Sequence, residues 1–190
     1  MEKMSLKAVA IFYSVLMIAS MIWITLRGDN TWFVHPDYSG PTDAVWMLRG
    51  VGLGLATSLF VVIFSRLISH YFEWARALER EFAKMLGPLS WMQVLGLALF
   101  SGVGEEMFFR GAMQPSLGIY ATTIIFGLCH IGPSRTYIPW TLMALVLGGV
   151  LGWYFDKTGA LIAPMTSHIF INLINLSFIR FGQQKAALSP

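Results

Sequence analysis

Residues 104–115 read GEEMFFRGAMQP, which places two glutamates and an arginine inside an otherwise apolar stretch. The chain around them has 190 residues, is 56% hydrophobic and only 12% charged, and has a mean hydropathy of +0.64. An ordinary soluble domain is about 45–50% apolar and about 25% charged. We therefore predict an integral membrane protein, and the three charges at lipid depth need a physical reason.

Apolar runs on both sides of this stretch are long enough to cross a bilayer, which takes roughly 20 helical residues. Charges and Pro or Gly separate the runs. They predict an all-α, polytopic membrane helical bundle with about six transmembrane helices, folded as a single membrane domain over residues 1–190. The expected spans are 6–26, 45–65, 90–114, 117–131, 137–155 and 160–179.

A different pattern occupies residues 70–86, HYFEWARALEREFAKML. Its apolar side chains recur at helical spacing, and its charged side chains lie mostly on the opposite side. This indicates an interfacial amphipathic helix between the second and third spans. A helix that binds a protein partner is the alternative.

Orientation follows from the basic residues in short loops, which favour the cytoplasmic side. With both termini inside, nine Lys and Arg residues face the cytoplasm and three face the other side. The nine are Lys3, Lys7, Arg66, Arg76, Arg80, Lys84, Arg135, Arg180 and Lys185, and the three are Arg27, Arg49 and Lys157. The net charge of +3 comes from residues that flank the spans and form no basic stripe, so we expect no nucleic-acid partner.

The spacing of the three central charges separates their roles. Glu106 and Arg110 are four residues apart and predict an ion pair on one helix face. Glu105 points about 100° away from Glu106 and has no partner in its own helix. A charge near a helix centre costs about 2.5–3.5 kcal/mol, and such residues are by default functional candidates. Glu105 is therefore a candidate general base.

Other spans supply polar groups that could meet it. His130 lies four residues after Phe126, and His168 lies four residues before Asn172, so each pair shares a helix face. Taken singly, these residues could simply connect helices by hydrogen bonds. Taken together, they favour a polar reaction centre, in which a carboxylate and a histidine activate water while His168 and Asn172 stabilise an oxyanion.

Neither nucleophile near this centre has a base beside it. Cys129 and its neighbour His130 face apart on a helix, and Ser101 has no adjacent base. We expect Cys129 to be a buried apolar residue.

Trp140 lies near a predicted span end, where a tryptophan usually anchors a helix at the membrane interface.

In order, the motifs EExxxR, FxxxH and HxxxN resemble those of the CPBP family, which comprises CAAX proteases and bacteriocin-processing enzymes and is also called Abi. The resemblance covers about residues 90–180, the expected catalytic core. It implies that Glu105 and His130 activate water and that His168 and Asn172 form an oxyanion hole. The supporting residues in these motifs are Glu106, Arg110 and Phe126.

The resemblance also implies an activity, a glutamic-type intramembrane endopeptidase. Its substrate would be a membrane-associated or lipidated protein or peptide, cut near its C-terminus or membrane anchor. The compact size resembles the bacterial branch of the family and favours a multi-pass protein of the bacterial plasma membrane. The sequence does not indicate an oligomeric state.

We expect no cofactor. Two histidines and a carboxylate could form a zinc site, but HExxH is absent and Arg110 would repel a dication.

Two other functions compete with proteolysis: a catalytically silent scaffold or immunity protein of the same fold, and a proton-coupled transporter that uses buried acids as a relay. No internal repeat of the kind transporters often show is visible in the sequence.

Overall fold

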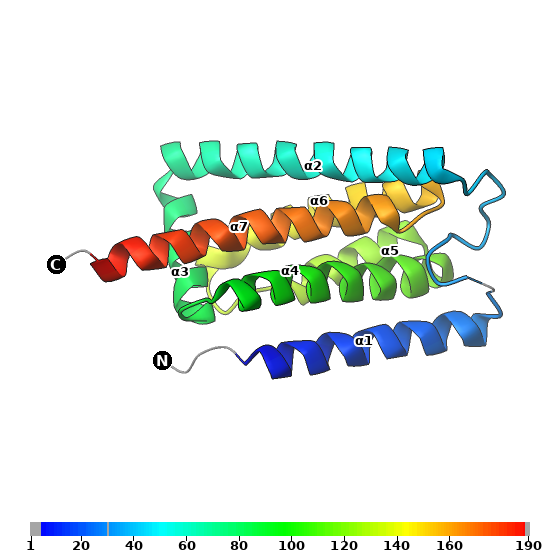
Figure 1. The fold of residues 1–190 in the computed structure, drawn as a ribbon, viewed down its shortest axis with the longest axis horizontal. Coiled ribbons are helices and arrows are strands. Elements are labelled where there is room, and N and C mark those ends of the chain that lie inside the picture. The colour runs from blue at the N-terminus through cyan, green and yellow to red at the C-terminus, as the bar shows by residue number, and fades with distance from the viewer. Residues whose placement is uncertain (1–4, 30, 189–190) are drawn as a thin grey trace.

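The computed structural model describes residues 5–29 and 31–188, and these form a bundle of long helices (Figure 1). Lys3 of the orientation prediction lies outside them. In chain order the elements are α1 (Leu6–Arg27), α2 (Ala44–Tyr71), α3 (Glu73–Leu86), α4 (Trp91–Glu106), the π-helix η1 (Met107–Met113), α5 (Gln114–Cys129), the 3-10 helix η2 (Arg135–Tyr137), α6 (Ile138–Thr158) and α7 (Ile162–Leu188). The all-α prediction is confirmed.

Five helical stretches in the described ranges are long and apolar enough to cross a membrane. The third, Trp91–Cys129, contains α4, η1 and α5 and is 39 residues long. Its backbone breaks at Gly118, where φ is 81° and ψ is 162°, a conformation that glycine adopts without a steric penalty. The chain reverses there, and the rest of α5 runs back into the bundle, packed against η1 and α6 (Figure 1). This stretch therefore holds the third expected span and a shorter returning helix, 119–129, in the place of the fourth expected span.

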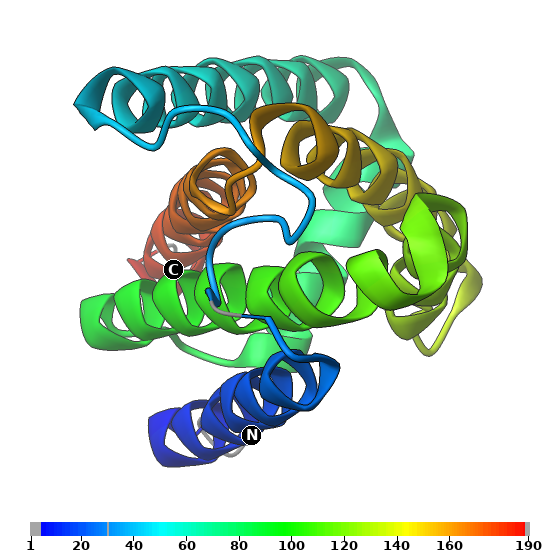
Figure 2. The ribbon, with the colours of Figure 1, turned by 90° about the vertical axis from the view of Figure 1, so that its right-hand side faces the viewer.

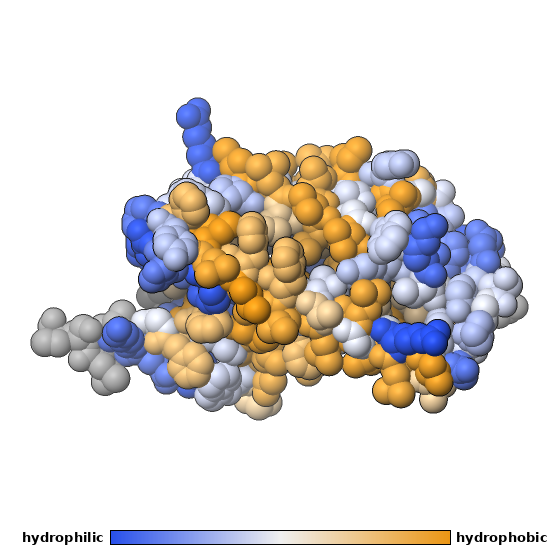
Figure 3. Space-filling view, turned by 90° about the horizontal axis from the view of Figure 1, so that it is seen from above, coloured by the Kyte–Doolittle hydropathy of each residue, from blue (hydrophilic) through white to orange (hydrophobic). Residues whose placement is uncertain are grey.

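The face of the bundle seen in Figure 3 is mostly apolar across the middle and more polar at both ends. Large apolar side chains are exposed on several helices, among them Phe12 and Ile22 on α1 and Phe60 on α2. Cys129, expected to be buried, is exposed as well. Because lipid chains are as apolar as a protein interior, an apolar residue in a membrane span gains little by facing inward. The apolar run around Cys129 was therefore no evidence of burial.

The amphipathic helix is confirmed as α3, which crosses the end of the bundle where α1 begins and α7 ends (Figure 1). It begins at Glu73, later than expected, because Phe72 is extended (φ −116°, ψ 127°) and separates it from α2. Hydrogen bonds from Arg80 and Arg76 lower the pKa of Glu73, so this exposed side of α3 stays charged.

A loop closes the opposite end of the bundle (Figure 2). His35 donates a backbone hydrogen bond to Gly159, and Leu161 donates one to Phe33, at 2.9 and 3.0 Å. Arg27 donates to the backbone oxygens of Gly111 and Ala112. The last turn of η1 is thus tied to the end of α1, and the loop covers this end of the bundle.

Cysteine labelling tests the predicted orientation. In a Cys129→Ala background, we expect a membrane-impermeant maleimide to label Ser116→Cys from outside intact cells. Ser134→Cys should react only after the membrane is permeabilised, because the α5–α6 connection lies at the end that carries α3. Both positions are exposed. The reverse pattern of labelling would show that the bundle is inverted.

Candidate active site

Side chains from three crossings meet at Glu105, near the end of α4. Its Oε2 lies 3.7 Å from Nε2 of His130, at the end of α5, and 3.9 Å from Nε2 of His168, on α7. The three side chains are only 12–16% exposed. The predicted convergence of the carboxylate and both imidazoles is therefore present in the fold.

The second acid and the arginine form the predicted pair beside this centre. Nη1 of Arg110 lies 3.0 Å from Oε1 of Glu106, and both side chains are almost fully buried. Arg110 also donates to the backbone oxygen of Gly148 on α6, and its guanidinium lies 4.3 Å from the centre of the Phe126 ring on α5. One buried cation therefore connects three helices.

The backbone that carries Arg110 is a π-helix, a form that is rare and frequent at functional sites. It directly follows the two glutamates, and most of its side chains are buried. The sequence indicated the helix but gave no sign of the change in helical hydrogen bonding. That change alters the direction in which residues 107–113 point relative to α4.

Hydrogen bonding fixes the tautomer of His130. Its Nδ1 lies 2.7 Å from the backbone oxygen of Phe126. A carbonyl oxygen can only accept, so Nδ1 carries the hydrogen. In the neutral ring, Nε2 then holds a lone pair, and this is the atom that faces Glu105. His130 is therefore held as a proton acceptor at the centre.

His168 makes a contact that the sequence did not predict. Its Nδ1 lies 2.7 Å from Oε1 of Glu106, the oxygen that also accepts from Arg110. Sequence spacing had placed His168 with Asn172, four residues later. Glu106 therefore orients two groups at once, the guanidinium and the imidazole.

Asn172 is held by Ser101. Its Nδ2 donates to Ser101 Oγ at 2.9 Å, and that hydroxyl donates in turn to the backbone oxygen of Leu97 at 2.7 Å. The sequence analysis considered Ser101 only as a nucleophile. Its position four residues before Glu105, on the same helix face, was the signal that it faces the site.

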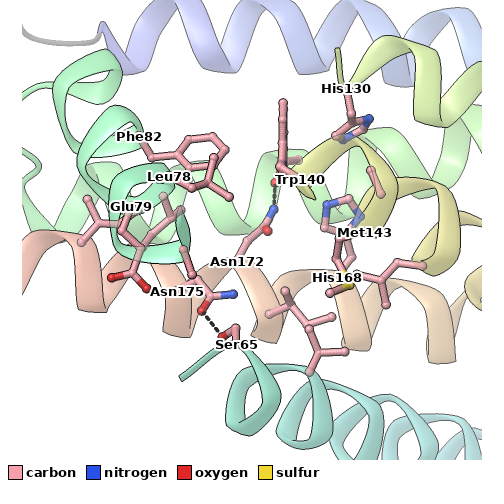
Figure 4. A pocket seen from close by; sticks show the side chains of 18 of the residues that line it. Ser65, Leu78, Glu79, Phe82, His130, Trp140, Met143, His168, Asn172 and Asn175 are labelled. Atoms are coloured by element: carbon pink, nitrogen blue, oxygen red, sulfur yellow. Dashed lines mark hydrogen bonds between the residues drawn. The ribbon is translucent and has the colours of Figure 1, made fainter. Parts of the chain in front are cut away.

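A cavity of about 410 Å³ adjoins these residues (Figure 4). It extends from Glu105 past Trp140 on α6 to Phe82 on α3, and it is lined mainly by apolar side chains. Trp140 lies near the start of α6, and its ring lies 5.0 Å from that of His130 and 5.1 Å from that of Phe82. An aromatic wall therefore leads from α3 to the imidazole.

The core that carries these residues is similar to known proteins. Residues 87–174 match the family model of type II CAAX prenyl endopeptidase Rce1-like proteins. This confirms the predicted resemblance and supports an intramembrane protease, and it does not favour a silent scaffold or a transporter. The matched range includes all four predicted catalytic positions and leaves out α1, α2 and α3.

One relative covers more of the chain. The Bacillus subtilis (strain 168) protein named "Uncharacterized protein YpbD" is 27% identical over 141 residues, which are 70% of this chain and 71% of that protein. No solved structure gives a significant match. The catalytic roles of individual residues, and the division into a core at 90–180 within one membrane domain, stay predictions.

Within residues 5–29 and 31–188, no group of three or more His, Cys, Asp or Glu side chains has an arrangement that could hold a metal ion. The absence of a cofactor remains a prediction.

Removing the buried cation should destabilise the fold. We expect Arg110→Met to lower the free energy of unfolding by about 3–5 kcal/mol, because Glu106 is left charged and buried with one partner fewer. The thermal unfolding of the purified protein in detergent measures this effect. The double variant Glu106→Gln/Arg110→Met should recover part of the lost free energy of unfolding, because the buried Glu106 carboxylate that had lost its arginine is no longer there.

Arg80→Met serves as the matched control. It also removes an arginine from an ion pair, but this pair lies on the exposed side of α3. Exposed ion pairs contribute little, so its melting temperature should stay close to that of the unmodified protein. Equal effects of Arg110→Met and Arg80→Met would contradict the structural role given to Arg110.

Proposed function

We propose that this protein is a glutamic-type intramembrane endopeptidase, in which Glu105 and His130 activate a water molecule. One observation carries the proposal. Oε2 of Glu105 is buried, accepts no hydrogen bond from any described residue, and lies 3.7 Å from the Nε2 lone pair of His130 at the cavity wall. Because Oε2 has almost no accessible surface, the neighbouring side chains must shift slightly to admit a water, which about 2.8 Å from each atom would donate to both acceptors.

The chemistry then follows from the two acceptors. The water oxygen attacks the carbonyl carbon of the substrate amide, and its proton passes to Glu105, with Nε2 of His130 holding the second hydrogen. The tetrahedral intermediate carries a negative oxygen. When the C–N bond breaks, the proton held by Glu105 moves to the leaving nitrogen, which gives a free acid and a free amine.

His168 and Asn172 are suited to stabilise that oxygen. Nδ1 of His168 already contacts Glu106, so a proton on Nε2 makes the ring an imidazolium with one N–H directed toward the centre. The carboxylates of Glu105 and Glu106 and the guanidinium of Arg110 together carry one net negative charge. The proton on His168 would balance that charge. Asn172 uses one amide hydrogen on Ser101 and has a second one for the substrate. Donors held in advance are the main source of oxyanion stabilisation.

The cavity favours a short, extended and largely apolar segment of substrate. His168 and Asn175 both line it on one face of α7 and are separated by about 10 Å along the helix, at 1.5 Å per residue. This length matches about three residues of extended chain at about 3.3 Å each. We propose that the substrate is a membrane-associated or lipidated protein or peptide, cut near its C-terminus or membrane anchor, in a bacterial plasma membrane.

A cleavage assay with lipid-embedded or prenylated peptides tests the catalytic roles. We expect Glu105→Gln and His130→Ala to lower kcat/KM by at least about 100-fold, because each removes a proton acceptor. Asn172→Ala should lower kcat by about 100- to 1,000-fold, which is the effect of losing one oxyanion donor. All three should keep the melting profile of a folded protein.

His70→Ala is the control for removing an imidazole. His70 lies at the end of α2 and does not line the cavity, so cleavage should continue at the unmodified rate. Cleavage by Glu105→Gln or His130→Ala at that same rate would overturn the mechanism even if the protein is a protease.

Exhaustive chelation tests for metal dependence. We expect cleavage to survive dialysis against a strong chelator, and elemental analysis of the active protein to give less than stoichiometric zinc. Activity that is lost on chelation and restored by zinc would instead assign Glu105, His130 and His168 as metal ligands.

A further inference from the structure

Tyr13 on α1 is a polar side chain at the centre that neither the motifs nor the family match includes. Its hydroxyl donates to Oε1 of Glu105 at 3.0 Å, and its ring lines the cavity. Oε2, the other oxygen of the same carboxylate, is the one that faces both imidazoles. The two oxygens of Glu105 therefore have different surroundings, and α1 creates the difference.

From this contact we infer that Tyr13 is the positioning residue of the general base, an inference that rests on the proposed function. The terminal torsion of a glutamate side chain has a broad preference, so the rotamer alone does not fix the plane of the carboxylate. A hydrogen bond to one oxygen does fix it. Tyr13 holds Oε1 and so keeps Oε2 directed at His130 and at the position proposed for water.

The packing of α1 on α4 is built for this contact. Gly104 directly precedes Glu105, and a Cβ there would lie 3.0 Å from Cδ1 of Tyr13 and 3.4 Å from its backbone oxygen. Even the methyl group of an alanine at 104 would require Tyr13 to shift by a few tenths of an ångström. Glycine lets the backbones approach closely, which brings the phenol within reach of the neighbouring carboxylate.

Kinetics separate positioning from structural support. We expect Tyr13→Phe to lower kcat by about 10- to 100-fold with KM within about twofold, because only the alignment of the base is lost. Tyr154→Phe is the matched control. It removes a hydroxyl that lies 2.8 Å from Thr57 Oγ1, outside the site, and should leave both constants unchanged. An unchanged kcat in Tyr13→Phe, or a raised KM at constant kcat, would overturn the inference.

Infrared spectroscopy tests the contact without any substrate. We expect the difference spectrum of Tyr13→Phe against the unmodified protein to show a shifted carboxylate stretching band. This difference signal should be absent when the same substitution is made in a Glu105→Gln background. It should also be absent for Tyr154→Phe. The same band should also shift when 3-fluorotyrosine replaces Tyr13, a change that keeps the ring, the hydroxyl and the packing.

The two proposals fail separately. Cleavage that persists in Glu105→Gln ends the proposed mechanism, whatever the spectra show. A Tyr13→Phe spectrum with no carboxylate change, in a protein whose Glu105→Gln variant is inactive, ends the role of Tyr13 and leaves the general base in place.

Discussion

The buried ion pair between Arg110 and Glu106 is the interaction on which the rest of the site depends. Charges inside a bilayer must be paired, and this pair is almost inaccessible to solvent. Arg110 also reaches a carbonyl on α6 and a ring on α5, while Glu106 accepts from His168 on α7. Satisfying two charges therefore fixes the relative positions of four helices, and these helices carry the candidate catalytic side chains.

That arrangement gives the two glutamates different tasks. Oε1 of Glu106 accepts from both Arg110 and His168 and so holds these two side chains in place. Glu105 lines the cavity, with one oxygen bound to Tyr13 and the other directed at two imidazoles. The two adjacent glutamates thus differ because Glu106 lies in the packed interior and Glu105 lines the cavity. The family match covers both, whereas the tyrosine comes from a helix outside it.

The shape of the bundle is consistent with the proposed cleavage of a substrate that lies in the lipid bilayer. A loop and Arg27 close one end, and the amphipathic α3 crosses the other end and contributes Phe82 to the cavity. The aromatic wall of Phe82, Trp140 and Phe126 gives an apolar segment a continuous surface up to His130. Water-soluble chains would gain little from such a lining, because its contacts are chiefly apolar.

The sequence by itself determined the helical class, a bundle of about six membrane helices and the amphipathic helix, and it predicted a cluster of polar side chains that the fold brings together. Hydrophobic runs have a length set by the bilayer, and ionisable residues within them are too costly to be incidental. Spacing of four residues also indicated the Glu106–Arg110 pair correctly, because such contacts lie within one helix. The predicted burial of Cys129 was wrong, since an apolar residue in a span can face either lipid or protein. Only the tertiary structure decided that His168 contacts Glu106, that Ser101 holds Asn172 and that Tyr13 reaches Glu105. Each of these contacts joins helices distant in the chain, and no local periodicity encodes which faces of two helices will meet.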